Sequence, residues 1–129
     1  MFKSFIIIFI LHIFGGFFLQ SKRISKLKRT NILFLLEHVG LYTLIFIIFS
    51  PILLGITFWE GIEFSLINGV LHFIVDFFTG KLKGRLNGKN EFKYNMTVLL
   101  DYSLHLAMLF ATFVWLNSYA LNSVTFWDK

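Results

Sequence analysis

The stretch Asn68-Gly-Val-Leu-His-Phe-Ile-Val-Asp76 places a histidine and an aspartate four residues apart within an apolar segment, which extends from about residue 61 to about residue 80. A segment of about 20 apolar residues can cross the hydrocarbon of a bilayer as a helix. In a helix, residues four apart lie on the same face. Ionisable side chains are costly in hydrocarbon, so they turn toward neighbouring helices or a polar cavity. The stretch therefore predicts a membrane-embedded helix with one inward polar stripe.

The rest of the chain has the same apolar character. Of its 129 residues, 57% are apolar and 18 are phenylalanine, which is more apolar surface than a soluble domain of this length could bury. Four stretches each have about the length of a helix that crosses a bilayer. We therefore predict an all-α fold, a four-transmembrane-helix bundle. It forms a single membrane domain, residues 1–129, with helices at about 2–20, 31–50, 61–80 and 94–117.

Basic residues are concentrated in two short segments between the apolar stretches. Ten of the twelve Lys and Arg residues lie within residues 21–30 and 81–93. Such residues are enriched in the cytoplasmic loops of membrane proteins, where they attract anionic lipid headgroups. We therefore expect a multi-pass protein of the inner (cytoplasmic) membrane, with both basic loops in the cytoplasm and both termini on the outer side.

Two other interpretations of these charges are less favoured. A signal peptide that ends near Gly15-Gly16 would send the first basic segment across the membrane, so an uncleaved first helix fits the charge rule better. Nucleic acid is not an expected partner, because no aromatic residues that could stack on bases are interleaved with the first basic segment. A second copy of the chain or another membrane protein remains open as a partner.

Six ionisable residues lie inside the predicted helices at a similar depth. At about 1.5 Å per residue, they lie about 6–16 Å from the cytoplasmic ends of their helices, within a slab about 10 Å thick. Their faces agree as well, since each belongs to a polar stripe at three- and four-residue spacing. We predict that four stripes meet in one centre, which contains His12, His38, His72, Asp76, Asp101 and His105.

Three chemistries could use such a centre. Imidazoles and carboxylates suit Zn or another first-row divalent metal ion, and i, i+4 pairs on facing helices can chelate one. A proton or ion relay is the second interpretation, and interhelical hydrogen bonding is the third. The chain has no cysteine, so thiolate ligands are absent. Four neighbouring residues could orient the ligands or a water molecule: Gln20, Glu37, Tyr42 and Asn68.

Four sequence runs resemble a known family when they are read in order. They are His12-Ile-Phe-Gly-Gly-Phe-Phe-Leu-Gln20, Leu36-Glu-His-Val-Gly-Leu-Tyr42, Asn68-Gly-Val-Leu-His-Phe-Ile-Val-Asp76 and Leu99-Leu-Asp-Tyr-Ser-Leu-His105. Over about residues 10–110, the chain is similar to the small bacterial and phage membrane proteins grouped as domain of unknown function 3307 (DUF3307). The resemblance implies the membrane fold and the polar centre, but no reaction.

The family pattern also implies four pairs of polar residues, one pair on each helix. The third and fourth pairs are intact here, as His72 with Asp76 and Asp101 with His105. In the first helix Gly16 stands where the pattern has an acid, and in the second Tyr42 stands where it has a histidine. Similarity to the family therefore implies a metal centre with fewer ligands than the full pattern would supply.

Our leading hypothesis is that the centre binds a divalent metal ion and supports hydrolysis of a lipid-borne or membrane-proximal substrate. The competing hypothesis is a non-enzymatic membrane scaffold whose His and Asp residues form interhelical hydrogen bonds. A proton or ion relay comes third, because it needs a polar path to the far side of the membrane. The outer halves of the predicted helices offer little beyond Thr57, Glu63 and Thr112 for such a path.

Overall fold

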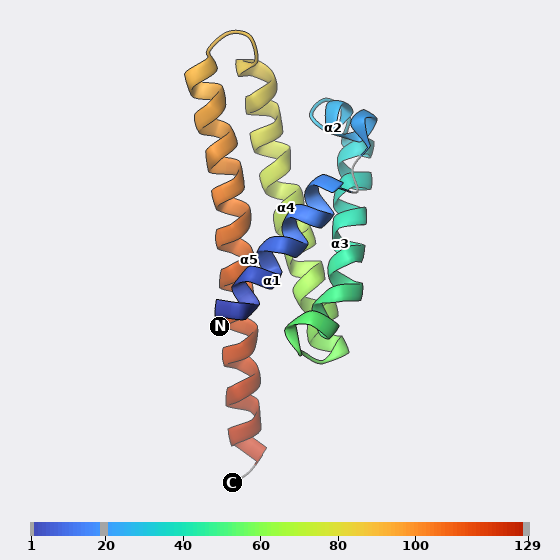
Figure 1. Ribbon diagram of the computed structural model, residues 1–129, viewed down its shortest axis with the longest axis vertical. Helices are drawn as coiled ribbons and strands as arrows, with labels where there is room; N and C mark the ends of the chain where they lie inside the picture. Colours follow the sequence, from blue (N-terminus) through green and yellow to red (C-terminus); the bar gives the residue numbers. More distant parts are fainter. Residues whose placement is uncertain (1, 19–20, 128–129) are drawn as a thin grey trace.

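The computed structural model describes residues 2–18 and 21–127 of the chain (Figure 1). The elements are α1 (Phe2–Ile13), a π-helical turn η1 (Phe14–Phe18), α2 (Lys22–Leu27), α3 (Ile32–Leu54), α4 (Phe58–Leu86) and α5 (Glu91–Trp127). The described residues contain no β-strand. The prediction of an all-α fold is confirmed.

Three helices in the described part of the chain are long and apolar enough to cross a membrane: α3, α4 and the Glu91–Ser118 part of α5. The first apolar helix is shorter. From Phe2 to Phe18 the helical segment has about 17 residues, or about 25 Å at 1.5 Å per residue, against about 30 Å of hydrocarbon. It crosses the other helices obliquely (Figure 1). The predicted bundle of four spanning helices is therefore supported for three of them.

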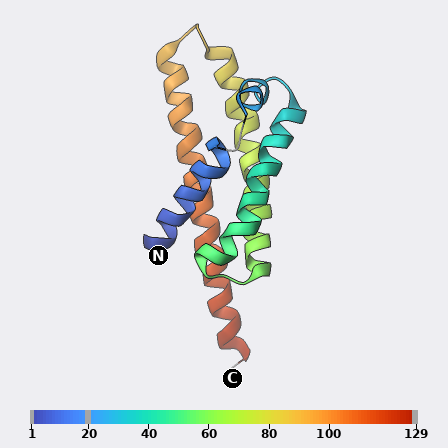
Figure 2. The same ribbon diagram turned by 45° about the vertical axis from the view of Figure 1, so that its right-hand side comes forward.

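The long helices pack in chain order. Helix α3 packs along α4, α4 packs along α5, and α1 contacts both α3 and α5. Figures 1 and 2 place α2 and the turn between α4 and α5 at one end of the molecule, with the turn between α3 and α4 near the other. The two basic segments therefore lie at the same end. We call it the basic end.

Several helices extend beyond their predicted bounds. Helix α4 continues through the basic residues to Leu86, because lysine and arginine are good helix formers and do not end a helix. Helix α3 passes Pro51, the proline at which we expected it to end, and ends at Leu54 before Gly55, whose φ is 68°. The first basic segment, expected to be a loop, contains α2. Its N-cap is Ser21, and Ile24 is buried.

The interior has an apolar half and a polar half. The apolar half is an aromatic-rich cluster in which Phe64 packs against Phe46 and Phe113, with ring centroids 5.9 and 6.1 Å apart. Leucine, isoleucine and phenylalanine side chains also cover much of the outer surface. Buried polar groups and exposed apolar ones suit a protein surrounded by lipid.

Glycines permit α3 and α4 to approach closely. A Cβ atom at Gly69 would overlap the side chain of Thr43, and one at Gly61 would overlap the ring of Pro51. Small residues at a helix interface let two backbones come together, which is the usual way that helices associate in membranes. The contact also brings together neighbouring parts of the polar centre, which α3 and α4 carry.

The first prediction concerns this contact. We expect Gly69→Ala to destabilise the protein by about 1–3 kcal/mol, because the added methyl group overpacks the interface with Thr43. Thermal unfolding of the purified protein in detergent would measure the effect. Adding Thr43→Ala should restore part of the loss, because it removes the atoms that the new methyl group would meet.

Gly84 provides the matched control. It lies on the same helix, and no atom lies within 4 Å of a Cβ built there. Gly84→Ala should leave the unfolding temperature unchanged or raise it slightly, since alanine has the higher helix propensity. Equal losses for the two alanine variants would contradict the close-packing explanation.

Candidate functional site

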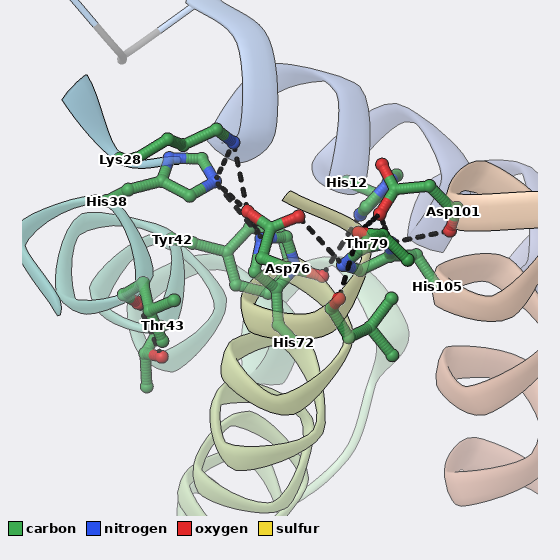
Figure 3. A network of polar contacts seen from close by, with 12 residues as sticks. His12, Lys28, His38, Tyr42, Thr43, His72, Asp76, Thr79, Asp101 and His105 are labelled. Atoms are coloured by element: carbon green, nitrogen blue, oxygen red, sulfur yellow. Dashed lines mark hydrogen bonds and ion pairs between the residues drawn. The ribbon is translucent and has the colours of Figure 1, made fainter. Parts of the chain in front are cut away.

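All six ionisable residues of the predicted centre come together around one cavity. Each is no more than 7% exposed. They line a cavity of about 520 Å³ between α1, α2, α3, α4 and α5. Figure 3 shows Asp76 in the middle of the group, with His38 and Lys28 on one side and His105 on the other. The helical stripes that lie far apart in the sequence therefore meet at a single point in the structure.

The tightest part of the centre consists of His38 from α3 and of His72 and Asp76 from α4. The Nε2 atoms of the two histidines are 3.1 Å apart. They lie 3.4 Å (His38) and 3.6 Å (His72) from Oδ2 of Asp76. One ligand atom from each of these residues could hold a metal ion. We call His38, His72 and Asp76 the triad.

Lys28 is the ion-pair partner of this triad. Its Nζ donates to Oδ2 of Asp76 at 2.9 Å and lies 3.1 Å from Nε2 of His38. The ammonium group supplies the positive charge that a buried carboxylate needs. A metal ion bound to the same atoms would repel this ammonium group, so the two cations compete for one position.

Asp101 and His105 on α5 form a second part of the centre. Nδ1 of His105 lies 2.7 Å from the backbone carbonyl oxygen of Asp101 and donates to it. Because that bond places the proton on Nδ1, Nε2 keeps its lone pair, and this buried atom has no hydrogen-bond partner within residues 2–18 and 21–127. Nε2 lies 3.8 Å from Oδ1 of Asp76. Asp76, Asp101 and His105 form another group that could hold a metal ion.

The carboxylate of Asp101 is already engaged on both sides. It accepts a hydrogen bond from Nζ of Lys83 at 2.8 Å on Oδ2, and Thr79 donates its hydroxyl proton to Oδ1. Lys83 is itself only 8% exposed. This ion pair ties α4 to α5 beside the cavity and reduces the negative charge that Asp101 offers to a metal ion.

Tyr42 connects the polar centre to the apolar half of the interior. Its hydroxyl group lies 3.2 Å from Nδ1 of His12, and its ring stacks on His72 with centroids 4.1 Å apart. The Tyr42 ring also contacts the ring of Phe46, with centroids 4.7 Å apart. Tyr42 therefore positions histidines of two different helices.

Of the residues expected to support the centre, Tyr42, Asn68 and Glu37 do not line the cavity itself. The side chain of Asn68 is buried, but its amide donates to the carbonyl oxygen of Phe64 one turn earlier in α4. Glu37 is exposed on α3. Gln20 lies outside the described residues.

Sequence reasoning missed three basic residues that line the cavity: Lys28, Arg29 and Lys83. Lys83 carries a detectable signal, because it follows Thr79 by four residues and extends the polar stripe of α4. Lys28 and Arg29 carry no such signal. They reach the cavity only because the chain turns back toward α3 after the short helix α2, which packs against the end of α3 (Figure 1).

Comparison with known proteins identifies a family. The sequence model of the family described as "Protein of unknown function (DUF3307)" matches residues 4–128, nearly the whole chain. No match was found among curated proteins or among solved structures.

The second prediction tests the ion pair between Lys83 and Asp101. Removing one partner of a buried pair typically costs about 3–5 kcal/mol, because the other charge stays buried without compensation. In metal-free protein we expect Asp101→Asn and Lys83→Met each to lower the unfolding temperature strongly. The double variant should lose less than the sum of the two single variants.

Lys81→Met serves as the control for this cycle. Lys81 is exposed on the same helix and lies over the ring of Phe77, an interaction worth about 0.5–1 kcal/mol. Its substitution should have a small effect that simply adds to that of Asp101→Asn. Additive losses for Lys83→Met and Asp101→Asn would show that the two side chains are not energetically coupled.

Proposed function

We propose that this chain, which belongs to the DUF3307 family, is an integral membrane protein that binds one divalent metal ion at His38, His72 and Asp76. The ion is zinc or another first-row metal, as the imidazole and carboxylate ligands favour. We further propose that the metal centre supports hydrolysis of a substrate at the membrane. The bound ion would polarise an oxygen atom of the substrate or activate a water molecule.

The spacing of the three ligand atoms is the observation that carries the proposal. Four ligands at about 2.0–2.1 Å from a tetrahedral zinc ion lie about 3.3–3.4 Å from one another. The three distances within the triad are 3.1, 3.4 and 3.6 Å. Nζ of Lys28 lies 2.9 and 3.1 Å from two of these atoms, near the spacing of a fourth ligand. Three protein ligands and one exchangeable position are typical of catalytic zinc sites.

The hydrogen-bond pattern favours a ligand site over interhelical hydrogen bonding alone. Nε2 of His105 is buried without a hydrogen-bond partner among the described residues. Histidines whose only role was to connect helices would be expected to satisfy such atoms, since an unpaired buried polar group costs about 1–3 kcal/mol. The lone pair of His105 faces the cavity, where it can bind a water molecule or a ligand.

We propose a single ion because the second group offers weaker ligands. The distance between Nε2 of His105 and Oδ1 of Asp76 is 3.8 Å, and both oxygens of Asp101 are engaged. In addition, Gly16 and Tyr42 carry no charge or imidazole at the two positions where the family pattern has further ligands. In this proposal His12, Asp101 and His105 surround the ion and its ligand.

The proposal includes a membrane orientation. The basic end, with its lysines and arginines, would face the cytoplasm and contact anionic headgroups of the inner membrane, and both termini would lie outside. Helix α1 would then be the fourth membrane-spanning segment. The polar centre would lie in the cytoplasmic half of the bilayer, open to ligands from that side.

The third prediction concerns metal content. Protein purified in detergent without a chelator should carry about one metal ion per chain by elemental analysis, and added Zn²⁺ or Mn²⁺ should raise its unfolding temperature, because an ion that binds only the folded state stabilises it. Asp76→Asn and His72→Gln should abolish both effects. A wild-type protein without metal, whose unfolding temperature neither ion changes, would overturn the proposal.

Glu63→Gln is the matched control. Glu63 is an exposed carboxylate on α4, the same helix as His72 and Asp76, and it does not line the cavity. This variant should retain the metal content and the thermal shift of the wild type. Loss of metal in this variant as well would indicate that ions bind to exposed carboxylates and not to the triad.

A further inference from the structure

The cavity is larger and more basic than a metal site alone requires. Its volume of about 520 Å³ lies within the range of about 300–1,000 Å³ that is usual for small-molecule sites. Three cationic side chains line it: Lys28 and Arg29 from the turn that follows α2, and Lys83 from α4. Two carboxylates, those of Asp76 and Asp101, also line the cavity. With neutral histidines, the lining carries one net positive charge before any metal ion binds.

A divalent ion in the triad would raise this net charge to three. Because Lys28 lies against the same ligand atoms, its ammonium group would then lose its carboxylate partner. Its side chain is 17% exposed and flexible, so Nζ can move within the cavity. Arg29 already directs Nη1 toward the hydroxyl group of Tyr94 at 3.4 Å, a weak contact that another acceptor could replace. A cavity that holds the metal ion is therefore expected to bind an anion as well.

We propose that the metal-loaded cavity binds a phosphate group, with Lys28 and Arg29, from the turn that follows α2, as its ligands and the metal ion beside it. This inference rests on the proposed metal centre. A phosphate monoester carries between about −1.5 and −2 charges near neutral pH, and it presents three acceptor oxygens. Arginine and lysine are the side chains that most often bind such oxygens.

Lys28 therefore has two partners. Without metal it pairs with Asp76, and with metal it pairs with the phosphate group. The exchange makes anion binding depend on the metal ion, because only the loaded site frees the ammonium group.

The apolar wall of the cavity fits the rest of a phosphate ester. Phe9 and Ile13 of α1 and Leu106 of α5 line the cavity, and the first two are 40% exposed on the outer surface. A ligand whose phosphate group reaches α2 could thus place an apolar part along α1. The phosphate group can belong to a lipid headgroup or to a soluble ester. Lys28, Arg29 and the metal ion would bind either one.

Calorimetry with inorganic phosphate tests the inference. The protein would be loaded with Mn²⁺ in a detergent that contains no phosphate group, after Mn²⁺ binding has been measured separately. We expect phosphate to bind the loaded protein and not the metal-free protein. Lys28→Met should bind Mn²⁺ at least as tightly as the wild type, because a competing cation is gone. It should bind phosphate about tenfold or more weakly, as expected when a charge-assisted hydrogen bond is lost.

Lys26→Met is the control, since Lys26 is an exposed lysine in the last turn of α2, two residues before Lys28, and it does not line the cavity. It should bind both Mn²⁺ and phosphate as the wild type does. A loaded wild-type protein that binds no phosphate, or equal weakening by Lys26→Met and Lys28→Met, would overturn the phosphate site while leaving the metal centre intact. Absence of Mn²⁺ binding would instead overturn the metal centre, and the phosphate site with it.

A competition experiment distinguishes the two sources of the phosphate group. The loaded protein would be placed in micelles of the same phosphate-free detergent, with or without added phosphatidic acid. If the natural ligand is a lipid headgroup, phosphatidic acid should weaken the apparent binding of inorganic phosphate. Unchanged binding would assign the site to a soluble phosphate ester.

Discussion

The carboxylate of Asp76 is the group on which the polar centre depends. It is 6% exposed, and nitrogen atoms of Lys28, His38, His72 and His105 lie between 2.9 and 3.8 Å from its two oxygens. A buried carboxylate is stable only beside a compensating positive charge. Lysine supplies that charge in the structure, and a metal ion would supply it in the function that we propose. Asp76 therefore connects the turn after α2 with α3, α4 and α5.

Close helix packing makes these contacts geometrically possible. His38 lies on α3, whereas His72 and Asp76 lie on α4, so their ligand atoms meet only if the two backbones approach closely. Gly69 permits that approach beside Thr43. Tyr42 belongs to the aromatic-rich cluster in the apolar half of the interior, and its ring stacks on His72. The cluster therefore supports the histidine rings from the apolar side. The same packing that stabilises the bundle therefore also brings the side chains of the triad together.

The parts of the site that were predictable share one property, which is helical periodicity. His72 with Asp76 and Asp101 with His105 are four residues apart, so each pair had to share a helix face. Inward orientation then follows from the cost of ionisable groups in hydrocarbon. Helix ends were less predictable. The lysines near residue 83 predicted a loop, and Pro51 predicted the end of a helix. The structure shows that α4 continues past the lysines and that α3 continues past Pro51.

The sequence by itself determined the all-α class, the apolar helices and the faces that carry histidine and aspartate, because local spacing and composition set all three. Only the tertiary structure decided which atoms meet. It placed Nε2 of His38 3.1 Å from that of His72, and it brought Lys28, from the turn after α2 and far away in the chain, onto Asp76. Such contacts depend on how closely the helices approach and on where the turn between α2 and α3 lies. Periodicity along a single helix contains no information about either.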